Sequence, residues 1–305
     1  MIQFRLLYIS LLFLCSSALL AECQNKRVKV QVLGSGGPEL SDGRASSSYL
    51  IWLDGDGIVL IDAGSGSSLN YEKSGAKLID LQAFAFTHFH VDHSADFPAY
   101  IKAFYFTRRS QDLTVLGPEG NNLMPSATGF VDRMLGDKGA FPYLSDYIVA
   151  NKNSPFKVLG KNVSLKAHKK QVAYRTNDFS LLAIPVHHGP IPAVAWRINI
   201  AGCAITFSGD MNNQFKTLAR LAKGSDLLIA HNAIPEAQRG AGRSLHMPPS
   251  EIARIAHQAG VKKLILAHRM KRTLGKEQQT LAIIRRHYKG QVIFAEDMDI
   301  FKPNK

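Results

Sequence analysis

Three histidines and one aspartate lie within one short segment of this chain. Within six residues stand His88, His90, Asp92 and His93. The segment follows the apolar run Ala83–Thr87, which predicts a strand, and precedes Ser94–Phe106, whose apolar spacing predicts a helix. Histidines two residues apart at a strand end can point to the same side, and the next turn brings Asp92 and His93 back toward them. Neutral imidazoles and carboxylates bind zinc and similar divalent ions, so the segment predicts a metal site.

Short apolar runs typical of strands recur on both sides of this segment. They are Lys29–Leu33, Tyr49–Leu53, Ile58–Ile61, Leu113–Leu116, Val163–Ala167, Phe179–Val186, Ala193–Ile200 and Ala204–Ser208. The last third alternates predicted helices and strands, at Gln214–Ala222, Leu227–Ala230, Ser250–Ala259, Leu264–Ala267, Glu277–Tyr288 and Val292–Ala295. Two β-rich halves with helices between them predict an α/β fold: two packed mixed β-sheets flanked by helices, a four-layer αββα sandwich. Residues 136–175 are the least regular region and could hold an insertion that faces the substrate.

The N-terminus differs from the rest of the chain. Arg5 precedes the almost wholly apolar run Leu6–Leu20, and this pattern predicts a signal peptide over residues 1–21, cleaved after Ala21. Residues 22–305 are then one domain, exported to the periplasm or secreted, and an uncleaved N-terminal anchor is the alternative. We expect no membrane span in the mature chain. Two cysteines remain after cleavage, Cys23 and Cys203, and the sequence leaves open whether they form a disulfide.

The segment around His88 resembles the His-x-His-x-Asp-His signature of the metallo-β-lactamase superfamily. The other motifs of that family recur in order between residue 28 and about residue 300: Asp62 in Ile61-Asp62-Ala63-Gly64, His188 before Gly189-Pro190, Asp210 in Ser208-Gly209-Asp210, and His268 after Leu264–Ala267. The resemblance implies the same four-layer fold. It also implies a hydrolase.

The resemblance also implies a ligand set for two divalent metal ions. One ion would be held by His88, His90 and His188, and the other by Asp92, His93 and His268. Asp210 would bridge the two ions, and Asp62 would support the site without touching metal. His187 competes with His188, which we prefer because it directly precedes the Gly-Pro turn. Zinc is the expected metal, with manganese or iron as alternatives.

Two such ions would activate a bridging hydroxide and stabilise charge on the attacking and leaving oxygens. Asp92 and His246 are the candidate catalytic residues, with His246 as the acid that protonates the leaving group.

Two features resemble the branch that contains the transfer-RNA 3′-processing endonuclease (ribonuclease Z) and arylsulfatase-like enzymes. They are the N-terminal loop Leu33–Ser48 and the pair His246-Met247 before a helix. The nuclease branch carries His-Glu-Ala-Thr after the strand that corresponds to Leu227–Ala230. This chain has His231-Asn232-Ala233 there, so the glutamate is missing.

The formal net charge of +13 favours an anionic partner. We therefore predict an exported hydrolase of a small anionic phosphate or sulfate ester, with a phosphodiester as the preferred substrate. A ribonuclease Z-like endonuclease is an alternative, although nucleic acid is not favoured for an exported chain. A β-lactam or lactone hydrolase is a further alternative, and a metal-binding module without turnover is the non-enzymatic one. The sequence leaves the native metal and the oligomeric state open, and a dimer is one option.

Overall fold

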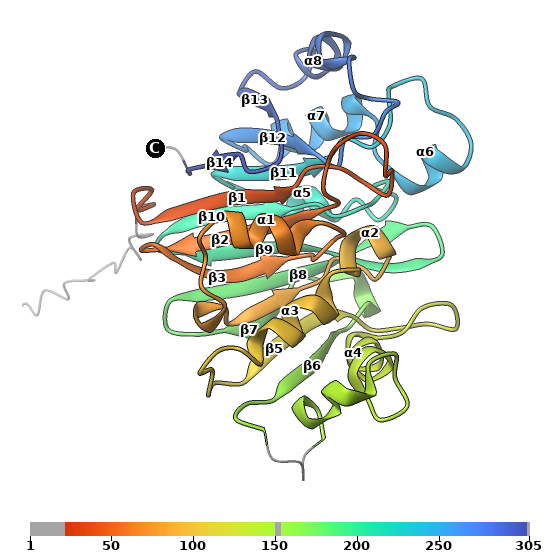
Figure 1. The fold of residues 1–305 in the computed structure, drawn as a ribbon. Coiled ribbons are helices and arrows are strands. Elements are labelled where there is room, and N and C mark those ends of the chain that lie inside the picture. Colours follow the sequence, from red (N-terminus) through yellow and green to blue (C-terminus); the bar gives the residue numbers. More distant parts are fainter. Residues whose placement is uncertain (1–21, 150–153, 304–305) are drawn as a thin grey trace, which may run out of the picture.

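The computed structural model describes residues 22–149 and 154–303, and the predicted signal peptide lies outside the described residues. Two seven-stranded sheets are formed by the described chain (Figure 1). The first sheet has, in spatial order, β14 (Ile300–Phe301), β1 (Val28–Gly34), β2 (Ser48–Leu53), β3 (Asp56–Ile61), β4 (Ala83–Ala85), β5 (Leu113–Pro118) and β6 (Val158–Val163). The second has β13 (Gln291–Phe294), β12 (Lys263–Ala267), β11 (Leu227–His231), β10 (Cys203–Phe207), β9 (Ile191–Ile200), β8 (Phe179–His188) and β7 (Gln171–Arg175).

Both sheets are mixed, and helices cover their outer faces. The helices are α1 (Ser67–Lys73), α2 (Val91–Ser94), α3 (Phe97–Phe104), α4 (Ala127–Leu135), α5 (Leu218–Leu221), α6 (Ala241–Leu245), α7 (Pro249–Gln258) and α8 (Glu277–Ile284). Three short 3₁₀ turns complete the elements, η1 (Leu78–Asp80), η2 (Pro142–Tyr147) and η3 (Lys166–His168). The predicted αββα sandwich is confirmed.

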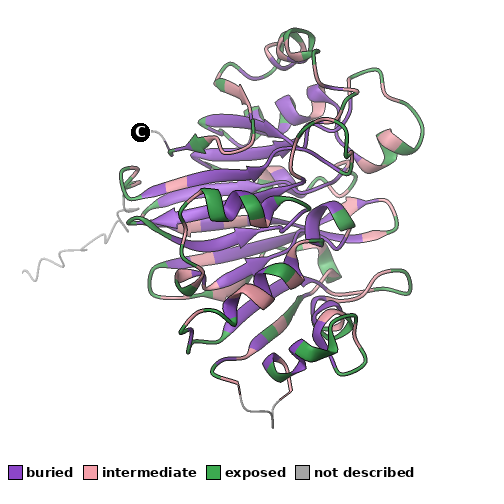
Figure 2. Ribbon diagram, viewed as in Figure 1, coloured by how far each residue is buried: buried purple, intermediate pink, exposed green. Residues whose placement is uncertain are grey.

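Three apolar clusters hold the four layers together, and strand β2 shows how. Its side chains alternate between faces: Tyr49 and Ile51 enter the cluster between the sheets, whereas Leu50 and Trp52 join the cluster under α1, α3 and α4. A strand buried on both faces has a continuous apolar run, as this one does. The third cluster packs the second sheet against α5, α7 and α8. The central strands are accordingly buried through most of their length, whereas β6, β7 and β13 at the sheet edges are partly exposed (Figure 2).

Several predicted elements differ from the structure. The helix predicted over Ser94–Phe106 begins only at Phe97, as α3, because Pro98 is accepted in the first turn of a helix, and α2 is a separate turn that ends at Ser94. The helix predicted over Glu277–Tyr288 ends at Ile284, as α8. The strand predicted over Val163–Ala167 is wrong: β6 ends at Val163, and its largely exposed polar residues gave no apolar run. The helix predicted over Gln214–Ala222 shortens to α5.

Cys23 and Cys203 form a disulfide that spans 180 residues of sequence and ties the start of the described chain to the start of β10. No helix within residues 22–149 and 154–303 is both long and apolar enough to span a membrane.

Candidate metal centre

The predicted site residues gather where strands of both sheets end at the same edge of the sandwich, the edge at which α2 lies (Figure 1). The His88–His93 segment follows β4, His188 ends β8, and His268 directly follows β12. Strands β10, β11 and β12 run parallel, so the segments after them emerge side by side. Carboxyl ends of parallel strands are where α/β folds place their sites.

Two groups of possible ligands share one aspartate. The first contains His88, His90, His188 and Asp210, whose donor atoms all lie within 4.8 Å of one another. The second contains His93, His231, His268 and again Asp210, within the same limit. Asp92 lies beside the second group, with its Oδ2 3.2 Å from His268 Nε2 and 3.5 Å from His93 Nε2. Asp210 thus stands where a carboxylate bridging two ions would stand.

Asp62 supports His93 through Nδ1 of its ring. Its Oδ2 lies 2.8 Å from His93 Nδ1 and accepts a hydrogen bond from Thr87 Oγ1, while its Oδ1 accepts one from the Thr87 backbone N–H. This pairing fixes the imidazole with Nε2 facing Asp92 and Asp210. Asp62 thus lies where it can support His93, as the family motif implies, and it belongs to neither ligand group.

The residues present fit divalent metal ions. His88 Nε2 and His93 Nε2 are buried, and neither has a hydrogen-bond partner in the described chain. Buried polar atoms without partners are rare, because each costs about 1–3 kcal/mol when left unsatisfied. Bound cations would satisfy both nitrogens.

The charges in the site agree with this fit. Burial lowers the pKa of His88, His90 and His188, so these imidazoles stay neutral, the form that binds metal. Burial also opposes charge on His93, but the carboxylates of Asp92 and Asp62 raise its pKa above the usual range. Burial opposes the ionised form of Asp92 too, but His93 and His268 outweigh it and lower the pKa to about 2. The site therefore balances ionised carboxylates with positive charge, which metal ions would supply in place of protons.

His231 is the site residue that the sequence prediction missed. The sequence pattern marked it only as the residue before Asn232, which stands where the nuclease motif has its glutamate. Its Nδ1 lies 2.8 Å from Asp210 Oδ1 and its Nε2 lies 3.1 Å from the hydroxyl of Tyr49. Burial lowers the pKa of His231 to about 4, so the ring is neutral. Because both nitrogens have partners, the ring orients Asp210. The available signal was its place at the end of β11, beside the strand that leads to Asp210.

His246 lies beside the possible metal ligands, whereas His187 lies apart from them. The ring of His246 is centred 5.4 Å from that of His188, and its buried Nδ1 lies 3.7 Å from Asp210 Oδ1 without a hydrogen-bond partner among the described residues. His187 is in neither ligand group, and its ring packs edge-on against Phe215 instead. The structure thus brings His188, and not its neighbour, to the centre.

Gly37 in the N-terminal loop leaves room for His268. A Cβ at this position would lie 2.7 Å from Cε1 of His268, so any larger residue would displace the ring. The loop therefore reaches the metal centre through a position that needs glycine.

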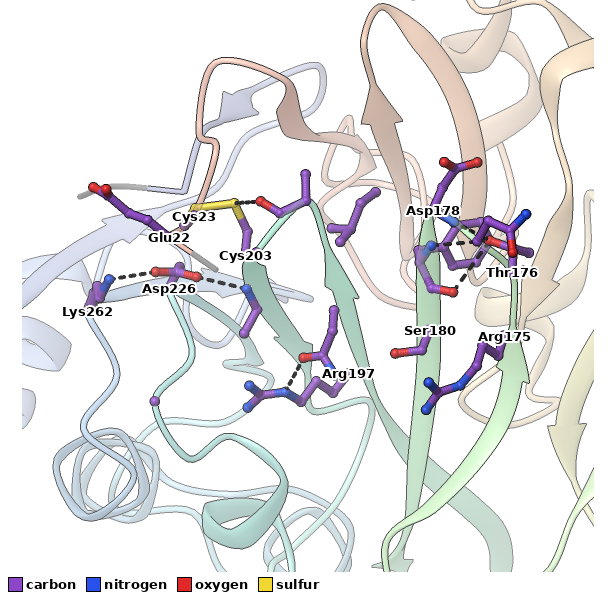
Figure 3. A pocket seen from close by; sticks show the side chains of 18 residues that line it. Glu22, Cys23, Arg175, Thr176, Asp178, Ser180, Arg197, Cys203, Asp226 and Lys262 are labelled. Atoms are coloured by element: carbon purple, nitrogen blue, oxygen red, sulfur yellow. Dashed lines mark hydrogen bonds and ion pairs between the residues drawn. A yellow bond between two sulfur atoms is a disulfide. The ribbon is translucent and has the colours of Figure 1, made fainter. Parts of the chain in front are cut away.

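A cavity of about 740 Å³ lies at the opposite end of the second sheet (Figure 3). It is lined by residues at the starts of β8, β10 and β11 and contains the disulfide. Arg175 and Arg197 line it, and Asp226 is paired with Lys262 at 2.8 Å. None of the predicted site residues is among its lining residues.

Comparison with known proteins decides the family. A model described as the beta-lactamase superfamily domain matches residues 58–269, more than half of the chain. The chain belongs to the beta-lactamase superfamily. The resemblance inferred from the motifs is confirmed.

Relatives place the chain near ribonuclease Z. Ribonuclease Z of Methanosarcina mazei is 25% identical, over 89% of this chain and 96% of that protein. The Thermobifida fusca ribonuclease Z is 26% identical, over 88% of this chain and 92% of its own length. The family and these relatives support a metal-dependent hydrolase.

Solved structures show the same fold. The metallo-beta-lactamase fold protein YhfI from Bacillus subtilis superposes with a TM-score of 0.68 at 20% identity, covering 90% of this chain and 99% of that one. The short form of human tRNase Z also gives 0.68, at 21% identity, covering 91% and 100%.

Replacing the shared carboxylate should empty the site. We expect Asp210→Ala to lose most bound metal and all turnover, since it removes a ligand from both groups. Metal per chain is measured by plasma mass spectrometry after purification with zinc. Asp178→Ala, an exposed carboxylate at the far end of the sandwich, is the matched control. Metal content in Asp210→Ala equal to that of the control would contradict the shared-ligand assignment.

Replacing His231 should weaken metal binding without abolishing it. Partners that orient a ligand typically contribute 10–100-fold to metal affinity, so His231→Ala should lose about that factor in competition with a chelator. Tyr49→Phe removes only the hydrogen bond between the Tyr49 hydroxyl and His231, so its metal affinity should fall by less. Unchanged affinity in His231→Ala would show that the ring does not hold Asp210.

Proposed function

We propose that the protein is an exported hydrolase of phosphate or sulfate esters that works with two divalent metal ions. Within these classes, we propose that it prefers phosphodiesters. The observation that carries this proposal is Asp210, a buried carboxylate shared by two groups of histidines. Two cations bound there would activate water and stabilise charge on the attacking and leaving oxygens of an ester. Zinc is the expected ion, and manganese or iron can use the same ligands.

The chain's own residues then have distinct tasks. His88, His90 and His188 are neutral ligands, and Asp62 and His231 fix the rings and carboxylate behind them. His246 is the candidate proton donor to the leaving oxygen: its Nδ1 has no hydrogen-bond partner among the described residues and lies 3.7 Å from Oδ1 of Asp210. Burial lowers the pKa of His246 to about 3, so the ring is neutral until an anionic substrate beside it favours proton uptake.

The substrate class rests on charge. The formal net charge is +13, of which the predicted signal peptide carries only the charge of Arg5, so the mature protein attracts anions over long range. Two-metal centres stabilise the attacking and leaving oxygens in displacements at phosphate esters, and sulfate esters offer a similar anionic group. Bound metal would neutralise the carboxylates of Asp92 and Asp210. The centre could then accept a further anion.

A ribonuclease Z-like endonuclease is the second candidate. Two ribonucleases Z align with almost nine tenths of this chain, and this similarity favours it. Against it, β11 ends in His231 and continues as Asn232-Ala233, without the glutamate that the nuclease motif places next to its histidine. In that branch the glutamate partners the histidine to which His246 is similar, and in the described residues no carboxylate is hydrogen-bonded to Nδ1 of His246.

Export is supported by two features. The apolar run after Arg5 has the length and flanks of a signal peptide. The Cys23–Cys203 disulfide belongs to an oxidising compartment, since reducing compartments keep thiols free.

A substrate panel tests the activity. We expect the zinc- or manganese-loaded protein to hydrolyse bis(p-nitrophenyl) phosphate faster than the phosphomonoester, the aryl sulfate, a lactone or a β-lactam. His246→Ala should lower kcat by about 10²–10⁴-fold while metal content stays near normal, because a proton donor rather than a ligand is lost. Loss of metal in this variant would contradict its role. Faster cleavage of a precursor transfer RNA than of any ester would favour the endonuclease instead.

Peptide mapping tests export. Expressed with its leader in a bacterium that forms disulfides in the periplasm, the mature protein should begin at Glu22 and yield a Cys23–Cys203 peptide under non-reducing conditions. A retained leader with both thiols free in the cytoplasmic fraction would contradict export.

A further inference from the structure

A pocket of about 630 Å³ opens between α2 and α3 on one side and α4 on the other. Its walls are mainly aromatic and aliphatic, and include Phe89, Pro98, Met124, Phe130, Met134 and Phe141. This volume and lining are typical of sites for small organic ligands. None of the tasks assigned above to the metal centre uses this pocket.

The pocket shares its wall with the metal centre. Helix α2 carries Asp92 and His93, while Val91 and Ser94 of the same helix line the pocket. The Ser94 hydroxyl donates a hydrogen bond to the backbone oxygen of His90, at 2.9 Å. Because successive helical residues point about 100° apart, α2 presents its ligands and its pocket residues in different directions. The metal centre and the pocket are therefore neighbours that share helix α2.

Exposed apolar side chains mark this side of the molecule. Val91 is 69% exposed and Tyr143 is 64% exposed, and both line the pocket. Lys102, also in the lining, has its Nζ 4.1 Å from the ring centre of Tyr105 and 5.7 Å from that of Tyr143. All the aromatic residues among the large, exposed hydrophobic side chains of the described chain lie in the pocket or around Lys102: Tyr105, Phe106, Phe141 and Tyr143. Such patches on a soluble domain mark binding sites.

The charges of the pocket have one sign. Among the described residues, Lys102 and Arg133 are the charged side chains of its lining, and no carboxylate lines it. A ligand that is anionic at one end and apolar at the other complements this arrangement. Phe141 and Tyr143 come from residues 136–175, which the sequence suggested as an insertion facing the substrate.

We propose that this pocket binds the apolar group of an amphiphilic anionic ester whose reacting group lies at the metal centre. The proposal rests on the proposed function and narrows it, from phosphate and sulfate esters in general to those with an extended apolar group. A concave pocket, rather than a flat patch, favours a single organic group over a membrane surface as the occupant.

Binding of alkylphosphonates to the zinc-loaded protein tests the proposal without requiring turnover. Affinity, measured by calorimetry, should rise from methyl- through butyl- to octylphosphonate, by up to about fourfold for each methylene buried. Phe141→Ala should reduce the ratio of octyl to methyl affinity by about tenfold, since it removes one apolar wall. Val172→Ala, an exposed apolar residue on strand β7, should keep the ratio. Thermal unfolding confirms that each variant is folded, and Tyr143→Ala replaces Phe141→Ala if the latter is not.

The outcomes separate this proposal from the proposed function. Hydrolysis of bis(p-nitrophenyl) phosphate with no effect of chain length on phosphonate affinity would overturn the pocket assignment alone. A ratio unchanged by both pocket variants would do the same. Binding to anionic phospholipid vesicles would also overturn the pocket assignment, if that binding were lost in Tyr143→Ala and phosphonate affinity did not depend on chain length. The exposed patch would then contact a membrane. Failure to bind methylphosphonate or hydrolyse any ester would count against the proposed function itself.

Discussion

A carboxylate buried among imidazoles is the constraint on which the structure depends. Asp210 is 3% exposed, and nitrogens of five histidines lie within 3.7 Å of its oxygens: His93, His188, His231, His246 and His268. An ionised group taken out of water needs compensating charge, and neutral imidazoles provide only part of it. Burial lowers the pKa of His188, His231 and His246, so these rings do not supply that charge. Burial opposes charge on His93 and His268 too, but the neighbouring carboxylates raise the pKa of both rings, so protons there can supply part of it. Cations bound between the rings would supply it.

The fold explains why these groups meet. Each predicted ligand follows or ends a strand at one edge of the sandwich, and the clusters between and outside the sheets hold those strands rigidly in register. Asp62 and His231 then act from behind the ligands, through hydrogen bonds of 2.8 Å to His93 and Asp210. The neighbouring pocket is built differently, from helices and from the segment after α4. In our proposals, the strands thus define the chemistry, whereas the helices and the later segment select the substrate.

The sequence predicted the architecture, because strands buried on both faces have apolar runs. The residues of the centre were implied by the resemblance of the motifs to the family, and the structure brings most of them together. It missed β6, whose exposed polar residues lack such a run. It also missed His231: a single histidine after a strand has no spacing signal, and its partner Tyr49 is 182 residues away. Residues 136–175 were suggested as a segment facing the substrate, but the pocket itself depends on packing between distant segments such as those of Val91 and Tyr143, which no local pattern indicated.

The central claim is that two metal ions share Asp210. Anomalous diffraction from crystals of the zinc-loaded protein, with data on both sides of the zinc absorption edge, tests it most directly. We predict two peaks about 3.5–4 Å apart, one on each side of the Asp210 carboxylate, with Asp62 and His231 outside both coordination spheres. A single peak, or peaks away from Asp210, would contradict the account.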